Sequence, residues 1–197
     1  MTVMRMRKIY EFKPDPTQPV LRNRLHLTKQ QRQSILKWLL YSLLLLVLSL
    51  VQDVVMSRFS VSGGTTELVA CGILLICLLQ SPESGGIFAL LASVMYTFTG
   101  SAPGFYCIAL LTILGVLLNV LRHSLLSKRF RSIFLCAGIG VLIYELAVFF
   151  LGVFLGSTYG ARITAFLMSG VLNVLALPVI YPIAFSIGKV GGKTWKD

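Results

Sequence analysis

The stretch Ser169–Lys189, "SGVLNVLALPVIYPIAFSIGK", is apolar almost throughout and reaches a basic residue only at its end. As a helix it would be about 30 Å long, which matches the hydrocarbon core of a bilayer. Similar apolar runs recur along the chain, whose 197 residues are 56% hydrophobic and only 13% charged. A soluble domain carries about twice that share of charged residues. The sequence therefore predicts an integral membrane protein.

Six apolar segments follow a polar, basic N-terminal tail, and together they predict an all-α membrane domain. The tail is residues 1–34, the transmembrane domain is 35–187, and a short basic tail occupies 188–197. The second and third segments are short, at about 21 Å each, so they could be two thin spans or a re-entrant hairpin. Either arrangement returns the chain to the same side. The predicted spans are 35–56, 67–80, 85–98, 104–121, 133–155 and 163–187.

The distribution of positive charge predicts the orientation. Sixteen of the 18 Lys and Arg residues lie in the N-terminal tail and first helical turns, in the loop 122–132, or in the C-terminal tail. The positive-inside rule then places both termini and the loop 122–132 in the cytoplasm. Anionic lipid headgroups and topology explain the net charge of +11, so no nucleic acid is expected as a partner. The predicted cytoplasmic basic patch comprises Arg122, Lys128, Arg129 and Arg131.

Several kinds of chemistry find no support in the sequence. It has no phosphate-binding glycine loop, no serine, histidine and acid set, and no pair of carboxylates in one neighbourhood. The four cysteines lie inside apolar segments and are interpreted as buried packing residues. His26 and His123 lack further metal ligands in sequence. We therefore expect no enzymatic activity, no metal and no cofactor.

Glu145, in "LIYELAVFF", is the acid nearest the middle of a predicted span, whereas Asp53 and Glu67 lie near helix ends, within reach of water. Helical spacing places three glycines on the same face as Glu145. Small residues at such spacing let another helix approach closely, so this face is predicted to pack against protein. The glycines of this predicted close-packing face are Gly138, Gly152 and Gly156.

Depth suggests a partner for Glu145. It lies about 18 Å from the inner end of the fifth span, and Asn173 lies about 15 Å from the outer end of the sixth. In a core of about 30 Å these depths nearly match. We expect an interhelical hydrogen bond between the Asn173 amide and the Glu145 carboxyl group, protonated or not. The alternative is a site for a proton or a substrate.

Two prolines interrupt the sixth span. Pro178 and Pro182 lack an N–H, so each leaves the carbonyl four residues earlier without its helical partner. We expect a kink in the inner half of this helix, which membrane proteins tolerate where neighbours satisfy the freed groups.

The closing pattern "NVLALPVIYP" and its basic tail resemble the C-terminal end of the rod shape-determining MreD family. The segment "ELVACGILLICLLQSPESGGIFALLASVMYTFTGSAPGFYCIALLTILGVLL" is similar to the middle of that family, with a Pro- and Gly-containing turn between two short apolar segments. The resemblance covers residues 36–187. Many members place an acid after the second short segment, where this chain has "YTFTG", so a role for that acid is not transferred. The N-terminal tail is also longer than the family pattern.

The resemblance implies a non-enzymatic scaffold or adaptor of the bacterial rod complex (the elongasome), needed for cell shape and lateral peptidoglycan synthesis. Its implied partners are an MreC-like protein, MreB filaments, and a RodA and class B penicillin-binding protein synthase. The implied fold resembles the substrate-binding component of energy-coupling-factor transporters. This yields the alternative function, a vitamin-binding membrane subunit, against which the outward half offers few polar side chains: Thr97, Thr99, Ser101, Tyr106 and Tyr159.

Overall fold

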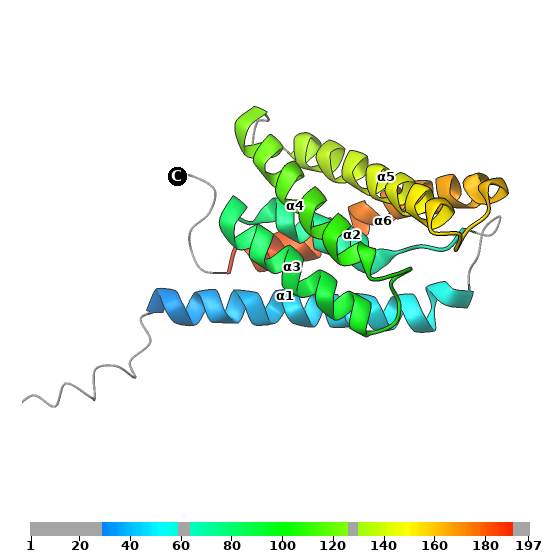
Figure 1. The fold of residues 1–197 in the computed structure, drawn as a ribbon. Coiled ribbons are helices and arrows are strands. Elements are labelled where there is room, and N and C mark those ends of the chain that lie inside the picture. Colours follow the sequence, from blue (N-terminus) through cyan, green and yellow to red (C-terminus); the bar gives the residue numbers. More distant parts are fainter. Residues whose placement is uncertain (1–28, 59–63, 126–129, 191–197) are drawn as a thin grey trace, which may run out of the picture.

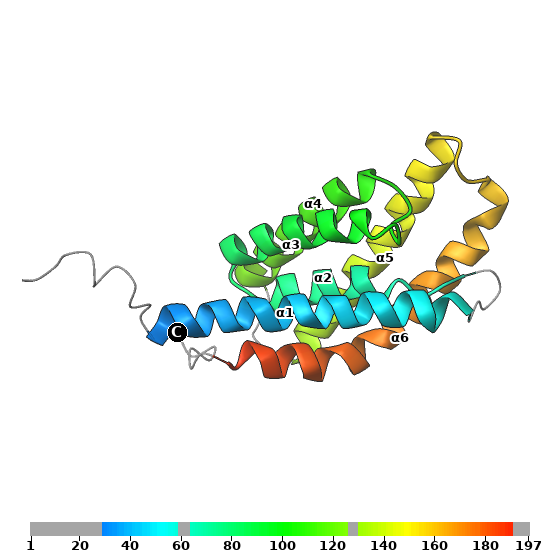
Figure 2. The same cartoon turned by 90° about the horizontal axis from the view of Figure 1, so that it is seen from below.

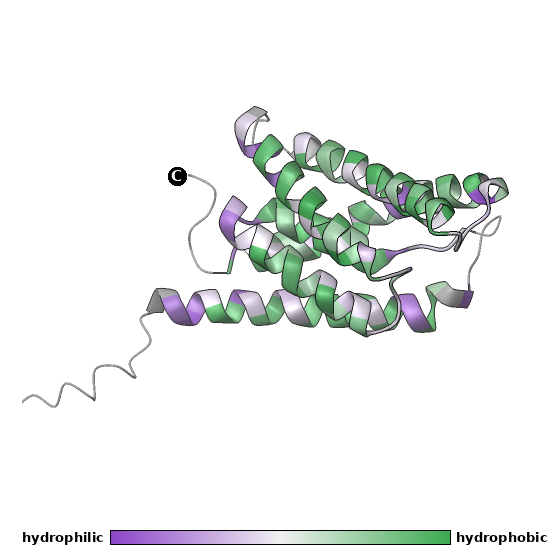
Figure 3. Ribbon diagram, viewed as in Figure 1, coloured by the Kyte–Doolittle hydropathy of each residue, from purple (hydrophilic) through white to green (hydrophobic). Residues whose placement is uncertain are grey.

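The computed structural model describes residues 29–58, 64–125 and 130–190, and these form an all-α bundle of six helices (Figure 1). Four helices are long and apolar enough to cross a membrane, so the chain is a multi-pass membrane protein by helix length and hydropathy. Hydrophobic residues run along the helices, and hydrophilic ones gather near their ends (Figure 3). The helices are α1 Lys29–Val54, α2 Leu68–Leu79, α3 Pro82–Phe98, α4 Tyr106–Leu125, α5 Phe130–Phe154 and α6 Ile163–Gly188.

The two short segments differ from one another in their surroundings. Every residue of α2 is buried, and this helix contacts each of the other five. Because α2 is apolar on all sides, it suits a position enclosed by protein. Gly72 lets α1 approach, since a Cβ there would lie 2.7 Å from Leu48 Cδ1. By contrast, α3 exposes one apolar face.

Side chains from other helices form hydrogen bonds with backbone groups at both ends of α2. At its start, Asn173 Oδ1 accepts from the Glu67 N–H at 2.7 Å, and Gln52 Oε1 accepts from the Val69 N–H at 3.0 Å. At its end, Asn119 Nδ2 donates to the Cys77 carbonyl at 2.8 Å. A helix end away from water needs such partners for its unpaired N–H and C=O groups. The polar residues thus fix α2 in place inside the bundle.

The remaining helices surround α2. The α1 helix lies along one side, and its beginning is at the same end of the bundle as the end of α6 (Figures 1 and 2). The α6 helix stays continuous through Pro178 and Pro182, and it changes direction between its first and last turns (Figure 2). The connection between α5 and α6 lies at the opposite end of the bundle, where the candidate site is found.

Candidate functional site

Glu145 lies at the centre of a polar network between α5 and α6. Its side chain is 3% exposed, and its Oε1 accepts from Asn173 Nδ2 at 2.5 Å. The Ser169 hydroxyl lies 3.0 Å from the same oxygen and 2.5 Å from the Thr65 carbonyl, so its one proton serves either acceptor. Glu145 and Asn173, which were paired because their depths match, are therefore in contact. The Asn173 side chain also caps the start of α2, which couples the network to the enclosed helix.

A second carboxyl group reaches this network from the start of α2. Glu67 is partly buried, and its Oε2 accepts from the Tyr96 hydroxyl at 3.3 Å. Its backbone N–H shares Asn173 with Glu145, so one amide side chain connects the two acidic residues. The sequence suggested only an interface position for Glu67. The structure instead brings two carboxylates, far apart in sequence, into one neighbourhood.

Both carboxylates line a cavity of about 520 Å³ near the α5–α6 connection. That size is within the usual range of about 300–1,000 Å³ for small-molecule sites. Arg162, which precedes α6, and the hydroxyl-bearing Thr65 and Thr164 also line it. The cavity can therefore offer hydrogen-bond acceptors, hydroxyl groups and one cation to a bound molecule.

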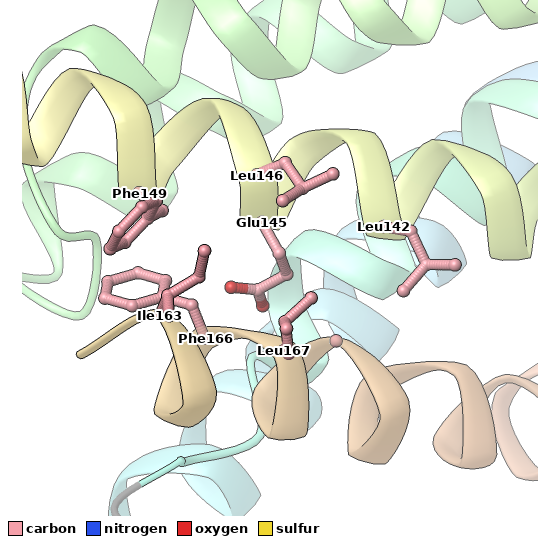
Figure 4. A pocket seen from close by; sticks show the side chains of 8 residues that line it. Leu142, Glu145, Leu146, Phe149, Ile163, Phe166 and Leu167 are labelled. Carbon is pink, nitrogen blue, oxygen red and sulfur yellow. The ribbon is translucent and has the colours of Figure 1, made fainter. Parts of the chain in front are cut away.

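On its other side Glu145 borders an apolar crevice of about 150 Å³ between α5 and α6. Figure 4 shows the Glu145 carboxylate directed toward α6, near Phe166 and Leu167, with Phe149 beyond them. Leu146 and Leu167 are partly exposed on the outer surface of these two apolar helices. The crevice therefore lies on the side of the bundle that faces lipid. Glu145 thus separates a polar cavity from an apolar crevice.

The glycines predicted to form a close-packing face have different environments. Gly138 faces α6, and a Cβ there would meet Val174 at an ordinary 3.8 Å. Gly152 packs against Thr158 of the following turn, and its carbonyl accepts from the Ser157 and Thr158 N–H groups. Gly156 follows the end of α5 with φ +70°, a conformation that glycine adopts readily. Gly152 and Gly156 thus terminate the helix, and close approach of α6 does not depend on them.

The predicted basic patch is placed only in part. Arg122 is 2% exposed at the end of α4, so its side chain is enclosed by the bundle and does not contribute to an exposed patch. Lys128 and Arg129 lie outside the described residues, as does the side chain of Arg131. The N-terminal tail up to residue 28 and the C-terminal tail from residue 191 also lie outside them.

Sequence reasoning did not identify Asn119, which is fully buried and holds the carboxyl end of α2. We expect Asn119→Leu to lower the free energy of unfolding by about 1–2 kcal/mol, because the Cys77 carbonyl loses the Asn119 hydrogen bond and keeps only the longer one from the Gln80 N–H. Thermal unfolding can be followed with a thiol-reactive dye, since all four cysteines are buried. Ser124→Ala on the same helix is the control, because Ser124 is exposed and bonds only carbonyls of α4. Equal unfolding temperatures for both variants would contradict the capping role.

Comparisons with known proteins add no relative: no family model, no curated protein and no solved structure matches the chain. Among the described residues, no group of three or more His, Cys, Asp and Glu side chains could hold a metal ion. The function is therefore inferred from the sequence pattern and from the geometry of the site.

Proposed function

We propose that this chain is a membrane adaptor of bacterial cell-wall elongation, similar in role to the MreD family. The observation that carries the proposal is the ordered resemblance over residues 36–187, from the short segments around "QSPESGG" to the closing "NVLALPVIYP". The six-helix architecture is compatible with it. In finer detail, the proposed fold is that of the substrate-binding component of energy-coupling-factor transporters.

The surface of α1 is the best candidate for contact with partner helices. Along this helix only a narrow stripe is buried, which includes Tyr41, Leu44 and Gln52. Most of its surface is free to face lipid or another membrane protein. Its exposed leucines include Leu39, Leu43, Leu46 and Leu50, each more than half exposed. In this proposal α1 binds an MreC-like protein or the wall synthase, and the basic termini contact anionic lipid on the cytoplasmic side.

We expect affinity purification of the full chain in mild detergent to recover an MreC-like protein or a wall synthase, and depletion to round the cells. Replacing the four exposed α1 leucines with alanine should reduce recovery of the partner by about tenfold, because each removes apolar contact area. The matched control replaces Ile113, Leu117 and Val120, which are similarly exposed on α4. Failure to recover any wall protein, with normal cell shape after depletion, would overturn the adaptor proposal.

The cavity favours a second candidate, a small-molecule-binding subunit of a transporter. Sequence reasoning weighed against it because few polar side chains could be assigned to the outward half. The structure gathers Glu67, Glu145 and Arg162 around one cavity of suitable size. The same purification distinguishes the two functions, because a transporter subunit should instead bring down an ATPase pair and a bound vitamin.

A further inference from the structure

The cavity and the crevice beside Glu145 together have the shape and chemistry of a site for an amphiphile. The cavity is polar and contains two carboxyl groups, whereas the crevice is lined by leucine, isoleucine and phenylalanine side chains apart from Glu145 and a glycine. Glu145 and Phe166 line both spaces. A molecule that occupied both would place a polar head in the cavity and an alkyl chain toward lipid.

The partners of Glu145 indicate which head the cavity accepts. Both hydrogen bonds to this side chain within the described part of the chain go to Oε1. Its Oε2 makes no hydrogen bond to the described residues, and Glu145 lines the cavity, so this oxygen can accept a hydrogen bond from a bound molecule. Glu67 supplies a second carboxyl group there. Carboxylates bind ammonium groups through charge-assisted hydrogen bonds, which are stronger than neutral ones.

The third charged group in the cavity has the opposite sign. Arg162 lines it from the residue before α6. Guanidinium groups match phosphate geometry and bind it through paired hydrogen bonds. Two carboxyl groups and one guanidinium therefore complement a head that carries both an ammonium and a phosphate.

The crevice supplies the argument for a lipid rather than a free headgroup. Apolar cavities of about 150 Å³ stay dry and take up small apolar groups. This crevice lies between α5 and α6, both long enough to span a membrane, and its outer residues Leu142 and Leu167 are exposed. Gly170 keeps it open, since a Cβ there would point at Leu142 Cδ2, 3.0 Å away, and at Glu145 Cγ, 3.7 Å away.

We propose that this is a binding site for an aminophospholipid of the phosphatidylethanolamine type. Its ammonium group contacts Glu145 and Glu67, its phosphate contacts Arg162, and the beginning of one acyl chain enters the crevice. The site is independent of the adaptor role and of the surface of α1, so the outcome of the purification experiment does not decide it.

Native mass spectrometry of the full chain in non-ionic detergent tests the proposal with added lipids. We expect phosphatidylethanolamine to be retained about tenfold more than phosphatidylcholine, whose trimethylated nitrogen has no N–H to donate. Phosphatidylglycerol, which has no amine, should be retained as weakly as phosphatidylcholine. Equal retention of the three lipids would overturn the proposal.

Variants test each part of the site separately. Glu145→Gln keeps the acceptor for Asn173 and Ser169 but removes the negative charge, so the preference for phosphatidylethanolamine should disappear. Glu83→Gln is the matched control, because Glu83 is in the first turn of α3 and lines neither space, and it should keep the preference. Gly170→Val narrows the crevice and should weaken retention of the lipid. Unchanged lipid selectivity in Glu145→Gln would overturn the proposal.

Soluble O-phosphoethanolamine distinguishes a lipid from a free ligand of the same chemistry. We expect it to stabilise the protein against thermal unfolding only at concentrations far above those at which the lipid binds, and equally in the wild type and Gly170→Val. If the soluble compound stabilises the protein as strongly as the lipid does, the lipid assignment is wrong.

Discussion

Replacing Asn173 with leucine is expected to lower the free energy of unfolding by about 2–5 kcal/mol. The side chain is fully buried, and it joins three helices through two hydrogen bonds. Its Oδ1 caps the start of α2 through the Glu67 N–H, and its Nδ2 donates to Glu145 on α5. Leucine has a similar size but leaves the N–H and the carboxyl oxygen without this partner. The Glu67 N–H is left unpaired, which costs about 1–3 kcal/mol. The Glu145 carboxyl group loses its bond from Asn173 but keeps the Ser169 hydroxyl as a donor, so this loss adds about 1–2 kcal/mol. The sum makes this one of the two largest effects predicted.

The measurement is thermal or SDS-induced unfolding of the purified protein, with the buried cysteines as reporters. Leu175→Ala is the matched control, because Leu175 is on the same helix but 66% exposed, so it should leave stability nearly unchanged. Glu145→Gln isolates the contribution of the charge on Glu145, since it keeps Oε1 as the acceptor for Nδ2. If Asn173→Leu unfolds like the control, Asn173 does not hold α2 in place.

The sequence predicted the helices well because the apolar runs are long and their ends carry polar residues. The expected sixth span, 163–187, differs from α6 by one residue. The contact between Glu145 and Asn173 was also within reach, because depth in a bilayer can be counted along a helix. Pro178 and Pro182, whose missing N–H groups weaken a helix locally, predicted a kink in the inner half of α6. The helix is continuous through both prolines and changes direction along its length (Figure 2).

The arrangement around α2 could not be derived in the same way. Burial of α2 on every side depends on which helices surround it, and a uniformly apolar segment gives no preferred face. Gln52 and Asn119 bond to backbone groups of α2. Every residue carries such groups, so the sequence does not show which of them a polar side chain will bond. Glu67 enters the site because the chain before α2 passes close to α6. Hydrophobic spacing does not report such tertiary contacts.

The contacts of the glycines could not be derived from their spacing either. A spacing of four residues suggested a packing face, but Gly156 lies beyond the end of α5, where the backbone has left the helix. The face was therefore extended past the point at which helical periodicity holds. A close approach does occur at Gly85, which lies in "QSPESGG" between the two short segments. The difference lies in what a Cβ would meet, and that information is present only in the folded structure.

Gly85→Ala is expected to destabilise the protein by about 2–3 kcal/mol, a cost typical of forcing an atom into a packed core. Gly85 is buried in the first turns of α3, beside the carboxyl end of α2. A Cβ at this position would lie 2.5 Å from Asn119 Nδ2 and 2.8 Å from the Cys77 carbonyl oxygen. These atoms form the hydrogen bond that holds the end of α2. Relief would require movement of α2, which the other helices enclose.

Gly86→Ala is the matched control, and unlike Gly85→Ala it should not lower the stability of the protein. In a helix interior, alanine is favoured over glycine by about 1 kcal/mol. A Cβ at Gly86 would meet only the tip of the Val116 side chain, at 3.0 Å, and that side chain can shift. Gly86→Ala should therefore be neutral or stabilising, whereas Gly85→Ala should lower the unfolding temperature. Equal shifts in unfolding temperature for the two variants would contradict this prediction. They would show that α2 can move away from the added methyl group, and that its position does not depend on the contact with Asn119.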